Sequence, residues 1–414
     1  MLQRIAELPE NIRQYLVVTA AYWSFTLTDG ALRMLVLLYF YQLGFSPFEV
    51  ALLFVLYEFF GVVTNLLGGW LGARFGLNRT LYAGMLLQIL ALLMLTVPDA
   101  WLTVVYVMIA QALSGIAKDL NKMSAKSSVK LLVPDGQSGR LFRWVAALTG
   151  SKNALKGVGF FIGSLLLATV GFRTGMLIMA GWIAAFLVLS LVLLRRDMGR
   201  ASAEPPFRAL LSKSRLVNML SAARFFLFGA RDIWFVVALP VFLQSVLDWS
   251  HTEVGSFMAL WIIGYGFVQS IAPRFVSAGE TKEDHRGRAV AVLWAALLSL
   301  LPALMAVLLI QGTDPAMVLI GGLALFAVLF AVNSSVHSWL ILEYARADGV
   351  SLDVGFYYMA NAGGRLIGTV LSGLVYQTWD MVGCLLFSAG FLLASTLLAT
   401  ALPGPQQPAR SNPP

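Results

Sequence analysis

Twelve stretches of mainly apolar residues follow one another along this chain, each long enough to cross the roughly 30 Å hydrocarbon core of a bilayer. They lie at 15–43, 47–72, 80–97, 101–121, 141–168, 173–194, 216–246, 254–273, 289–311, 316–343, 353–377 and 382–402. Hydrophobic residues make up 59% of the 414 residues and charged residues only 12%, so a water-soluble fold has no means of hiding the apolar surface. The sequence therefore predicts an all-α integral membrane protein with twelve transmembrane helices.

Charge alternates between successive connections. One set of connections carries Arg74, Arg79, Lys126, Lys130, Arg140, Arg195, Arg196, Arg200, Arg208, Lys213, Arg215, Lys282, Arg286 and Arg288. The opposite set carries Asp99, Asp248, Glu253, Asp314 and Asp380, with Arg173 as its main cation. By the positive-inside rule both termini are expected to be cytoplasmic. No small-residue cleavage site follows an apolar N-terminal run, so the first span is expected to act as an uncleaved signal.

The spans divide into two groups of six. Residues 1–194 and 216–402 are expected to form two pseudo-symmetric six-helix bundles, joined by a basic cytoplasmic linker at 195–215. The tail at 403–414 is rich in proline and is expected to be disordered. Two six-helix halves around a basic central loop resemble the major facilitator superfamily, whose halves are related repeats with a substrate site between them.

The connection between the second and third spans resembles the cytoplasmic gating motif of that superfamily. The matching positions are Gly69, Gly72, Arg74, Gly76 and Arg79. Ala73 stands where the family usually has aspartate, so the gate is expected to lack that charge relay. In the fifth span, Gly150, Gly159 and Gly163 keep the glycine spacing of the family's antiporter motif, although Ser164 replaces its proline. Glycines at this spacing are also common at plain helix contacts.

Two arginines interrupt apolar runs at matching places in the two halves. Arg33 lies in the first span, four residues after Asp29, and Arg231 lies in the seventh, next to Asp232. A charge at the centre of a bilayer costs roughly 2.5–3.5 kcal/mol even on lenient scales, so such residues usually face an interior site. The pair predicts an anion site at the interface of the two repeats. The alternative is a structural pair of arginines neutralised by the two aspartates.

Further cations and amides occur within the spans. The fifth span carries Lys152, Asn153 and Lys156, and the eleventh carries Asn361 and Arg365. The lysines are one turn apart on one helical face. They are expected to face the interior, with snorkelling to the membrane surface as the alternative. The amides of Asn153 and Asn361 suit hydroxyl or carbonyl oxygens, as do Asn333 and Ser334, and are equally ordinary in helix contacts.

A basic stripe ends the fourth span. Lys118 and Lys122 are open to two interpretations, an interior site or the membrane interface. Lys126 and Lys130, farther along, are expected to be solvated or to contact anionic lipid headgroups.

The interior positions predict the charge of the substrate. Five cations are counted there, Arg33, Lys152, Lys156, Arg231 and Arg365. Three anions accompany them, Asp29, Glu58 and Asp232. Because the planar fork of arginine suits phosphate and carboxylate oxygens, the site favours a solute with several negative charges and disfavours a cationic drug.

Proton coupling has four candidate groups: Asp29, Glu58, Asp232 and His337. The two aspartates are expected to serve as charge partners of the nearby arginines. Glu58 has no cation close in sequence, so it is the better candidate for a proton carrier, with structural hydrogen bonding as the alternative.

The rest of the composition predicts no cofactor. Cys384 is the single cysteine, so an intramolecular disulfide or a multi-thiol metal site is excluded. The three histidines are too scattered for a zinc centre, and no nucleophile with a nearby base indicates an enzyme. The net charge of +8 follows the loop pattern, and we expect no nucleic-acid partner.

Four segments resemble the ArsJ family of organoarsenical efflux permeases within the major facilitator superfamily. They are Tyr22–Arg33, Tyr57–Asn65, Ser114–Lys126 and Leu148–Gly157. The resemblance covers nearly the whole chain and is weakest in the linker and tail. It implies export of 1-arseno-3-phosphoglycerate across a bacterial inner membrane, giving arsenate resistance, with a functional link to the glyceraldehyde-3-phosphate dehydrogenase that makes this compound. The solute has an oxyanion at each end, which agrees with the cations counted above.

Other functions remain open at this stage. The runner-up is an organophosphate or anion exchanger of the same fold, which needs the same cations. A membrane-embedded enzyme or a sensor is less favoured, because the chain shows neither catalytic residues nor a large soluble domain. Arsenite export is disfavoured because trivalent arsenic seeks several thiolates. A monomer surrounded by lipid is expected.

Overall fold

Helices make up the part of the chain that the computed structural model describes, residues 10–75, 77–128, 138–194, 214–276, 286–344 and 350–402, and no strand occurs in these ranges. The first half contains α2 (Glu10–Gln42), α3 (Pro47–Leu53), α4 (Val55–Phe75), α5 (Leu77–Met94), the short helix η1 (Asp99–Trp101), α6 (Val104–Ser128), α7 (Ser138–Thr169) and α8 (Phe172–Leu193). The second half contains α9 (Arg215–Phe235), α10 (Ala238–Ser245), α11 (His251–Val276), α12 (Arg286–Ile310), α13 (Pro315–Tyr344) and α14 (Val350–Thr400).

The described helices account for the twelve spans expected from the sequence. By length and hydropathy alone, eight segments of the described chain qualify as membrane spans. One of them, in α14, is two spans in succession, because the backbone breaks at Trp379 and Asp380. The other three spans are α2, α6 and α7, which are long enough but contain the charged residues discussed below.

Several helix boundaries differ from the expected ones. The second span is split at Phe54 into α3 and α4, and the seventh is split at Val236 and Val237 into α9 and α10. The start of α3 is fixed locally, because Ser46 and Glu49 form a reciprocal capping box. The first helix already includes Glu10, where the described residues start, five residues before its apolar run. Most of the expected linker at 195–215, and the tail at 403–414, lie outside the described residues.

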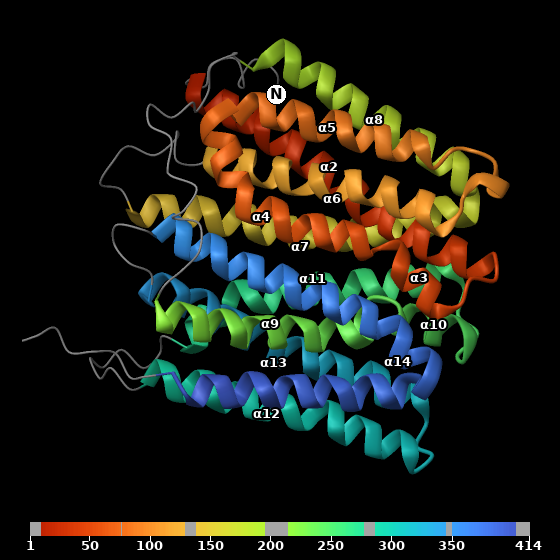
Figure 1. The fold of residues 1–414 in the computed structure, drawn as a ribbon, viewed down its shortest axis with the longest axis vertical. Coiled ribbons are helices and arrows are strands. Elements are labelled where there is room, and N and C mark those ends of the chain that lie inside the picture. Colours follow the sequence, from red (N-terminus) through yellow and green to blue (C-terminus); the bar gives the residue numbers. More distant parts are fainter. Residues whose placement is uncertain are drawn as a thin grey trace, which may run out of the picture.

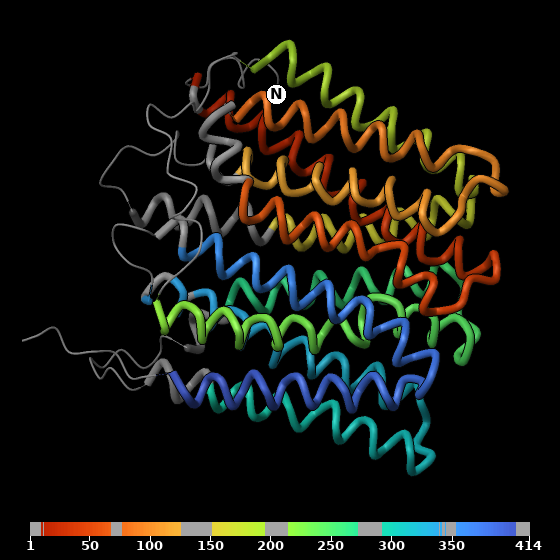
Figure 2. The backbone as a smooth tube through the Cα atoms, in the orientation of Figure 1, coloured from red at the N-terminus to blue at the C-terminus, as the bar shows by residue number. Residues whose placement is uncertain are grey.

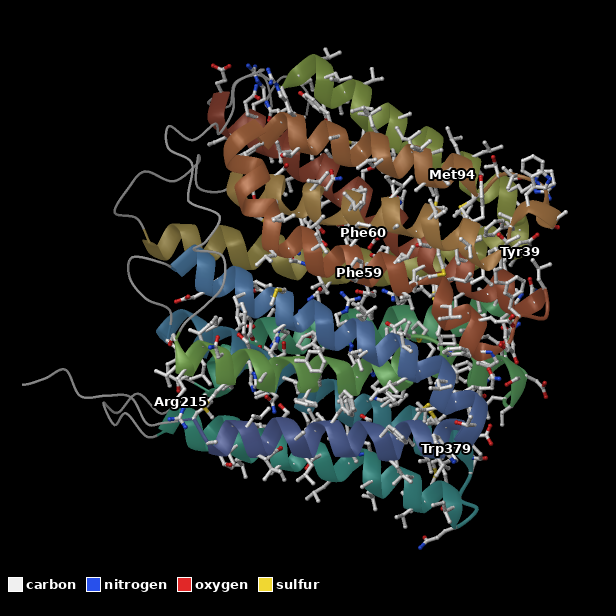
Figure 3. The ribbon with its side chains drawn as sticks, in the orientation of Figure 1. Tyr39, Phe59, Phe60, Met94, Arg215 and Trp379 are labelled. Carbon is white, nitrogen blue, oxygen red and sulfur yellow. The ribbon has the colours of Figure 1, made fainter. Side chains whose placement is uncertain are left out.

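The chain forms two bundles that lie side by side. Helices α2–α8 make up one bundle and α9–α14 the other, the upper and lower parts of Figure 1, and the tube in Figure 2 shows the same division. We call them the N-bundle and the C-bundle. The start of the N-bundle and Arg215 lie at one end, whereas Tyr39, Met94 and Trp379 lie at the other (Figure 3). At that second end, Tyr39 donates a 2.8 Å hydrogen bond to Asp99, which also pairs with Arg173. The membrane side of each end remains a prediction.

The bundles contact each other along two helix pairs, α7 with α11 and α4 with α14, and α3 also packs on α14. Small residues permit the close approach. A Cβ on Gly255 would lie 2.4 Å from the Cβ of Ser164, and one on Gly373 would lie 2.4 Å from the carbonyl oxygen of Pro47. Because lipid provides no hydrophobic driving force, such close packing is a main source of helix association in membranes.

Glycines also seat α7 against α2 inside the N-bundle. A Cβ on Gly159 would lie 2.3 Å from the carbonyl oxygen of Leu27, and one on Gly163 would lie 2.3 Å from that of Ala31. The glycine spacing noted in the sequence therefore serves a helix contact in this structure. This contact fixes how close α7, which carries Lys152 and Lys156, lies to α2.

We expect Gly159→Val to destabilise the N-bundle by about 1–3 kcal/mol, the usual cost of overpacking, because backbone atoms of α2 stand in the way. The measurement is thermal unfolding in detergent, together with the yield of monodisperse protein. Gly181→Val is the matched control, since a Cβ at Gly181 meets nothing within 4 Å. Equal effects of the two substitutions would contradict the packing described here.

Candidate substrate site

Five buried or partly buried charged residues form one network at the boundary of the two bundles. This central ion cluster consists of Arg33 on α2, Glu58 on α4, Arg231 and Asp232 on α9, and Arg365 on α14. Phe59 and Phe60, which follow Glu58, mark the level of this boundary in Figure 3. The two carboxylate side chains are at most 1% exposed and the three arginine side chains at most 18%. The cluster therefore lies largely out of water, where ionic interactions are strong and unpaired charges are costly.

Arg365 connects the two bundles. Its Nη2 donates to Glu58 Oε1 at 2.6 Å, across the boundary, and its Nε donates to Asp232 Oδ2 at 3.1 Å within the C-bundle. The guanidinium group has several donors in a rigid fork, so one arginine serves two carboxylates at once. Glu58 Oε1 accepts a second hydrogen bond, of 3.1 Å, from Arg33 Nη2. Arg231 binds the other oxygen of Asp232 through Nε at 2.7 Å and also through Nη2.

The surroundings of the cluster are positively charged. Lys118 on α6 lies 4.0 Å from the ring centroid of Tyr57, and Lys156 on α7 lies 5.7 Å from that of Phe160. Both ammonium groups act electrostatically on Glu58, and neither forms an ion pair within the described residues. Lys152 acts electrostatically on Lys156, while Asp29 acts on both Lys118 and Lys156 and Asp119 acts on Lys118. With Lys122 included, the described residues of this region provide seven cations (Arg33, Lys118, Lys122, Lys152, Lys156, Arg231 and Arg365) and four carboxylates (Asp29, Glu58, Asp119 and Asp232).

The expected pairing of Asp29 with Arg33 is wrong, and Glu58 has partners that its local sequence does not indicate. Glu58 has two cationic partners, Arg33 and Arg365. Both lie on other helices, so the sequence around Glu58 does not indicate them. Asp29 is not the ion-pair partner of Arg33 in this structure. It accepts a 2.6 Å hydrogen bond from the Tyr57 hydroxyl, while Arg33 turns to Glu58. Asp232 does pair with its neighbour Arg231.

Lys122 belongs to a separate pair inside the N-bundle. Its Nζ lies 2.6 Å from Asp119 Oδ1 and also binds the side chain of Asn65. Asp119 is fully buried and accepts a 3.0 Å hydrogen bond from Thr64. Lys122 is therefore held by a carboxylate, whereas Lys118 lies over the Tyr57 ring and forms no ion pair among the described residues, although Asp119 and Glu58 act on it at longer range. Lys126 and Lys130 have no described side chains.

The remaining predicted residues occupy various positions. Asn153 donates a 3.1 Å hydrogen bond to Gln269 across the α7–α11 contact, so it joins the two bundles. Lys152 and Asn361 are partly exposed, and Asn361 Oδ1 has no hydrogen-bond partner in the described part of the chain. Of the gating motif, Arg79 is exposed at the start of α5. The burial and contacts of Gly69, Gly72, Arg74 and Gly76 lie outside the described part of the structure.

Sequence reasoning missed three buried charges, Asp119, Arg224 and Asp353, the last of which lies near the start of α14. Asp119 was passed over, although it lies three residues before Lys122, a spacing that brings side chains together on a helix. Arg224 was passed over as well. It is 4% exposed and precedes Arg231 by seven residues in the same apolar run, and that spacing is the signal that would have revealed it.

The sequence matches the family described as Major Facilitator Superfamily over residues 18–348. The chain belongs to the major facilitator superfamily. It is thus a multi-pass membrane transporter with the two-bundle fold of that superfamily, and its cluster of charges lies where the two repeats meet. No curated protein matched the sequence.

Solved structures share this fold at low sequence identity. A variant of the nucleoside transporter NupG is 15% identical with a TM-score of 0.73, covering 95% of this chain and 100% of that one. A POT family transporter in complex with 5-aminolevulinic acid is 14% identical with a TM-score of 0.73, covering 95% and 97%. Another POT family transporter structure, in complex with a thioalcohol-conjugated peptide, is 14% identical with a TM-score of 0.74, covering 95% of this chain and 97% of that one. These similarities extend to the fold alone.

We expect Glu58→Gln to lower the free energy of unfolding by roughly 3 kcal/mol, because Arg33 loses its only carboxylate in the described structure. The double variant Glu58→Gln with Arg33→Gln is expected to recover part of this loss, since it removes the uncompensated charge. The measurement is chemical unfolding in detergent. Asp99→Asn is the matched control, because its pair with Arg173 is half exposed and contributes little. Strictly additive effects at Glu58 and Arg33 would refute the pairing.

Proposed function

We propose that this transporter exports an anionic organoarsenical, 1-arseno-3-phosphoglycerate, by alternating access and thereby gives arsenate resistance. The observation that carries the anionic substrate is the excess of positive charge between the bundles, together with two lysines, Lys118 and Lys156, that have no ion pair in the described residues. An oxyanion entering there relieves this imbalance. The identity of the anion rests on the resemblance of four sequence segments to the ArsJ permeases.

The cluster suggests how substrate binding and conformational change are linked. Arg33 and Arg365 are both held by one oxygen of Glu58. A phosphate or arsenate group offers the same kind of oxygen acceptor to the same guanidinium groups. We propose that the substrate competes with Glu58 for these arginines and so weakens the connection between the bundles. A Glu58 carboxylate released from these arginines becomes available to bind a proton, which fits a proton antiporter mechanism.

The proposal includes the cellular setting. Export requires a glyceraldehyde-3-phosphate dehydrogenase on the same side of the membrane, because that enzyme forms the compound when arsenate takes the place of phosphate. A bacterial inner membrane with both chain termini in the cytoplasm agrees with the charge of the loops. We propose a monomer in contact with lipid.

Everted membrane vesicles that contain the protein test the substrate. They are supplied with purified glyceraldehyde-3-phosphate dehydrogenase, its substrates and arsenate, and the arsenic accumulated inside is measured. Uptake that requires the complete mixture supports the organoarsenical. Uptake of simple phosphoesters without arsenic, in energised vesicles, would instead favour an organophosphate exchanger.

We expect Arg33→Ala or Arg231→Ala to abolish uptake in these vesicles while membrane insertion stays normal, because each removes a cation of the site. Arg33→Lys is also expected to reduce uptake, since a fork is replaced by a point charge. Arg173→Ala, at the exposed Asp99 pair, is the control and should transport normally. Near-normal flux in either of the first two variants would rule out the two-arginine site.

A further inference from the structure

A second group of buried polar side chains lies inside the C-bundle, apart from the central ion cluster. Arg224 on α9, Asn333 and His337 on α13, and Tyr357 on α14 form this group, which we call the Arg224 site. Arg224 is 4% exposed and the other three residues are fully buried. The guanidinium carbon of Arg224 lies 5.2 Å from the ring centroid of Tyr357, and its charge acts on His337. Asn333 lies one helical turn before His337, on the same face of α13.

Most polar atoms of the Arg224 site have no partner. Arg224 Nη1 donates to the carbonyl oxygen of Ser334 at 3.1 Å, but its Nε has no acceptor in the described structure. Both ring nitrogens of His337 and both amide atoms of Asn333 also lack hydrogen-bond partners among the described residues. A buried polar group left unsatisfied costs about 1–3 kcal/mol, so several together indicate an occupant.

The unpartnered groups define the chemistry of that occupant. They include three kinds of donor, a guanidinium N–H, an imidazole N–H and an amide NH₂, and two acceptors, the Asn333 amide oxygen and the other imidazole nitrogen, which suit a hydroxyl or protonated oxygen of the occupant. No carboxylate of the described chain lies within ion-pair distance of Arg224. Water satisfies the donors but leaves the guanidinium without a counter-charge. An oxyanion satisfies both the donors and the charge.

The site is connected to the central ion cluster through a shared aromatic ring. Arg224 and Arg231 are seven residues apart, which places them two turns apart on one face of α9. The ring of Phe228 lies between them, with its centroid 3.9 Å from the guanidinium carbon of Arg224 and 5.1 Å from that of Arg231. The two arginines thus form consecutive cationic positions along the interior of the C-bundle.

We propose that the Arg224 site is a second oxyanion subsite, which binds one charged end of a two-ended solute while Arg231 and Arg365 bind the other. The inference rests on the proposed function in requiring an anionic substrate. It adds a specificity that the central cluster alone does not supply, a preference for solutes with two separated anionic groups over solutes with one.

The test compares two probes on purified full-length protein in detergent. Inorganic phosphate has one anionic group, and 3-phosphoglycerate has a phosphate and a carboxylate separated by a three-carbon chain. Wild-type protein is expected to bind 3-phosphoglycerate more tightly in calorimetric titration. Arg224→Gln is expected to reduce this preference about tenfold, the effect of losing a charged hydrogen bond, with phosphate affinity little changed. Arg173→Gln is the matched control and should keep the preference.

A second variant keeps the test decisive if Arg224→Gln does not fold. Asn333→Leu keeps the cation and the approximate side-chain volume but removes the unpartnered amide, and it is also expected to reduce the preference. Thermal unfolding with and without 3-phosphoglycerate separates a structural role from a binding role. A purely structural Arg224 would lower the melting temperature of the free protein and leave the shift caused by 3-phosphoglycerate intact.

The outcomes distinguish this inference from the proposed function. An unchanged preference in a folded Arg224→Gln or Asn333→Leu protein would overturn the subsite and leave the central site standing. Failure of wild-type protein to bind either probe would overturn the subsite, whereas the vesicle uptake of arsenic decides the proposed function separately. Normal, Arg224-dependent binding combined with no organoarsenical uptake in vesicles would uphold the subsite and reject the organoarsenical as cargo.

Discussion

The fork of Arg365 joins the two bundles at their centre, and the rest of the arrangement depends on it. One guanidinium group binds a carboxylate from each bundle, Glu58 on α4 and Asp232 on α9. Burial makes each interaction strong and makes the loss of any partner costly. A transporter whose bundles must separate and close again therefore has an electrostatic connection at the point where its substrate is expected to bind.

This connection is held in place by close helix packing. Glycines on α7 let that helix approach α2, and small residues on α11 and α14 let the C-bundle approach the N-bundle. In this packed arrangement Arg33 and Arg365, from different bundles, both reach the same oxygen of Glu58. The apolar packing and the ionic cluster are thus parts of one arrangement. The glycines allow a short distance between helices, and at that distance the charged side chains are close enough to form ion pairs.

The proposed preference for anionic substrates rests on which cations have carboxylate partners and which do not. Arg231 and Arg365 are neutralised by Asp232 and Glu58, and Lys122 by Asp119. Lys118, Lys156 and Arg224 have no carboxylate partner within the described residues. These three groups come from both bundles. An anion that contacts them gains from charges that the protein itself leaves uncompensated, which is a physical basis for selecting solutes with more than one negative charge.

The sequence by itself determined the membrane location, the helical spans, the division into two halves and the presence of buried cations. These features are local, because hydropathy, charge and helical spacing act over a few turns. The tertiary structure decided the pairing. Glu58 has no cation close in sequence, yet it binds arginines 25 and 307 residues away, and Asp29 binds Tyr57 in preference to the nearby Arg33. The ion-pair partners depend on how the helices pack within and between the bundles. The sequence of one helix does not specify which residues of other helices it contacts.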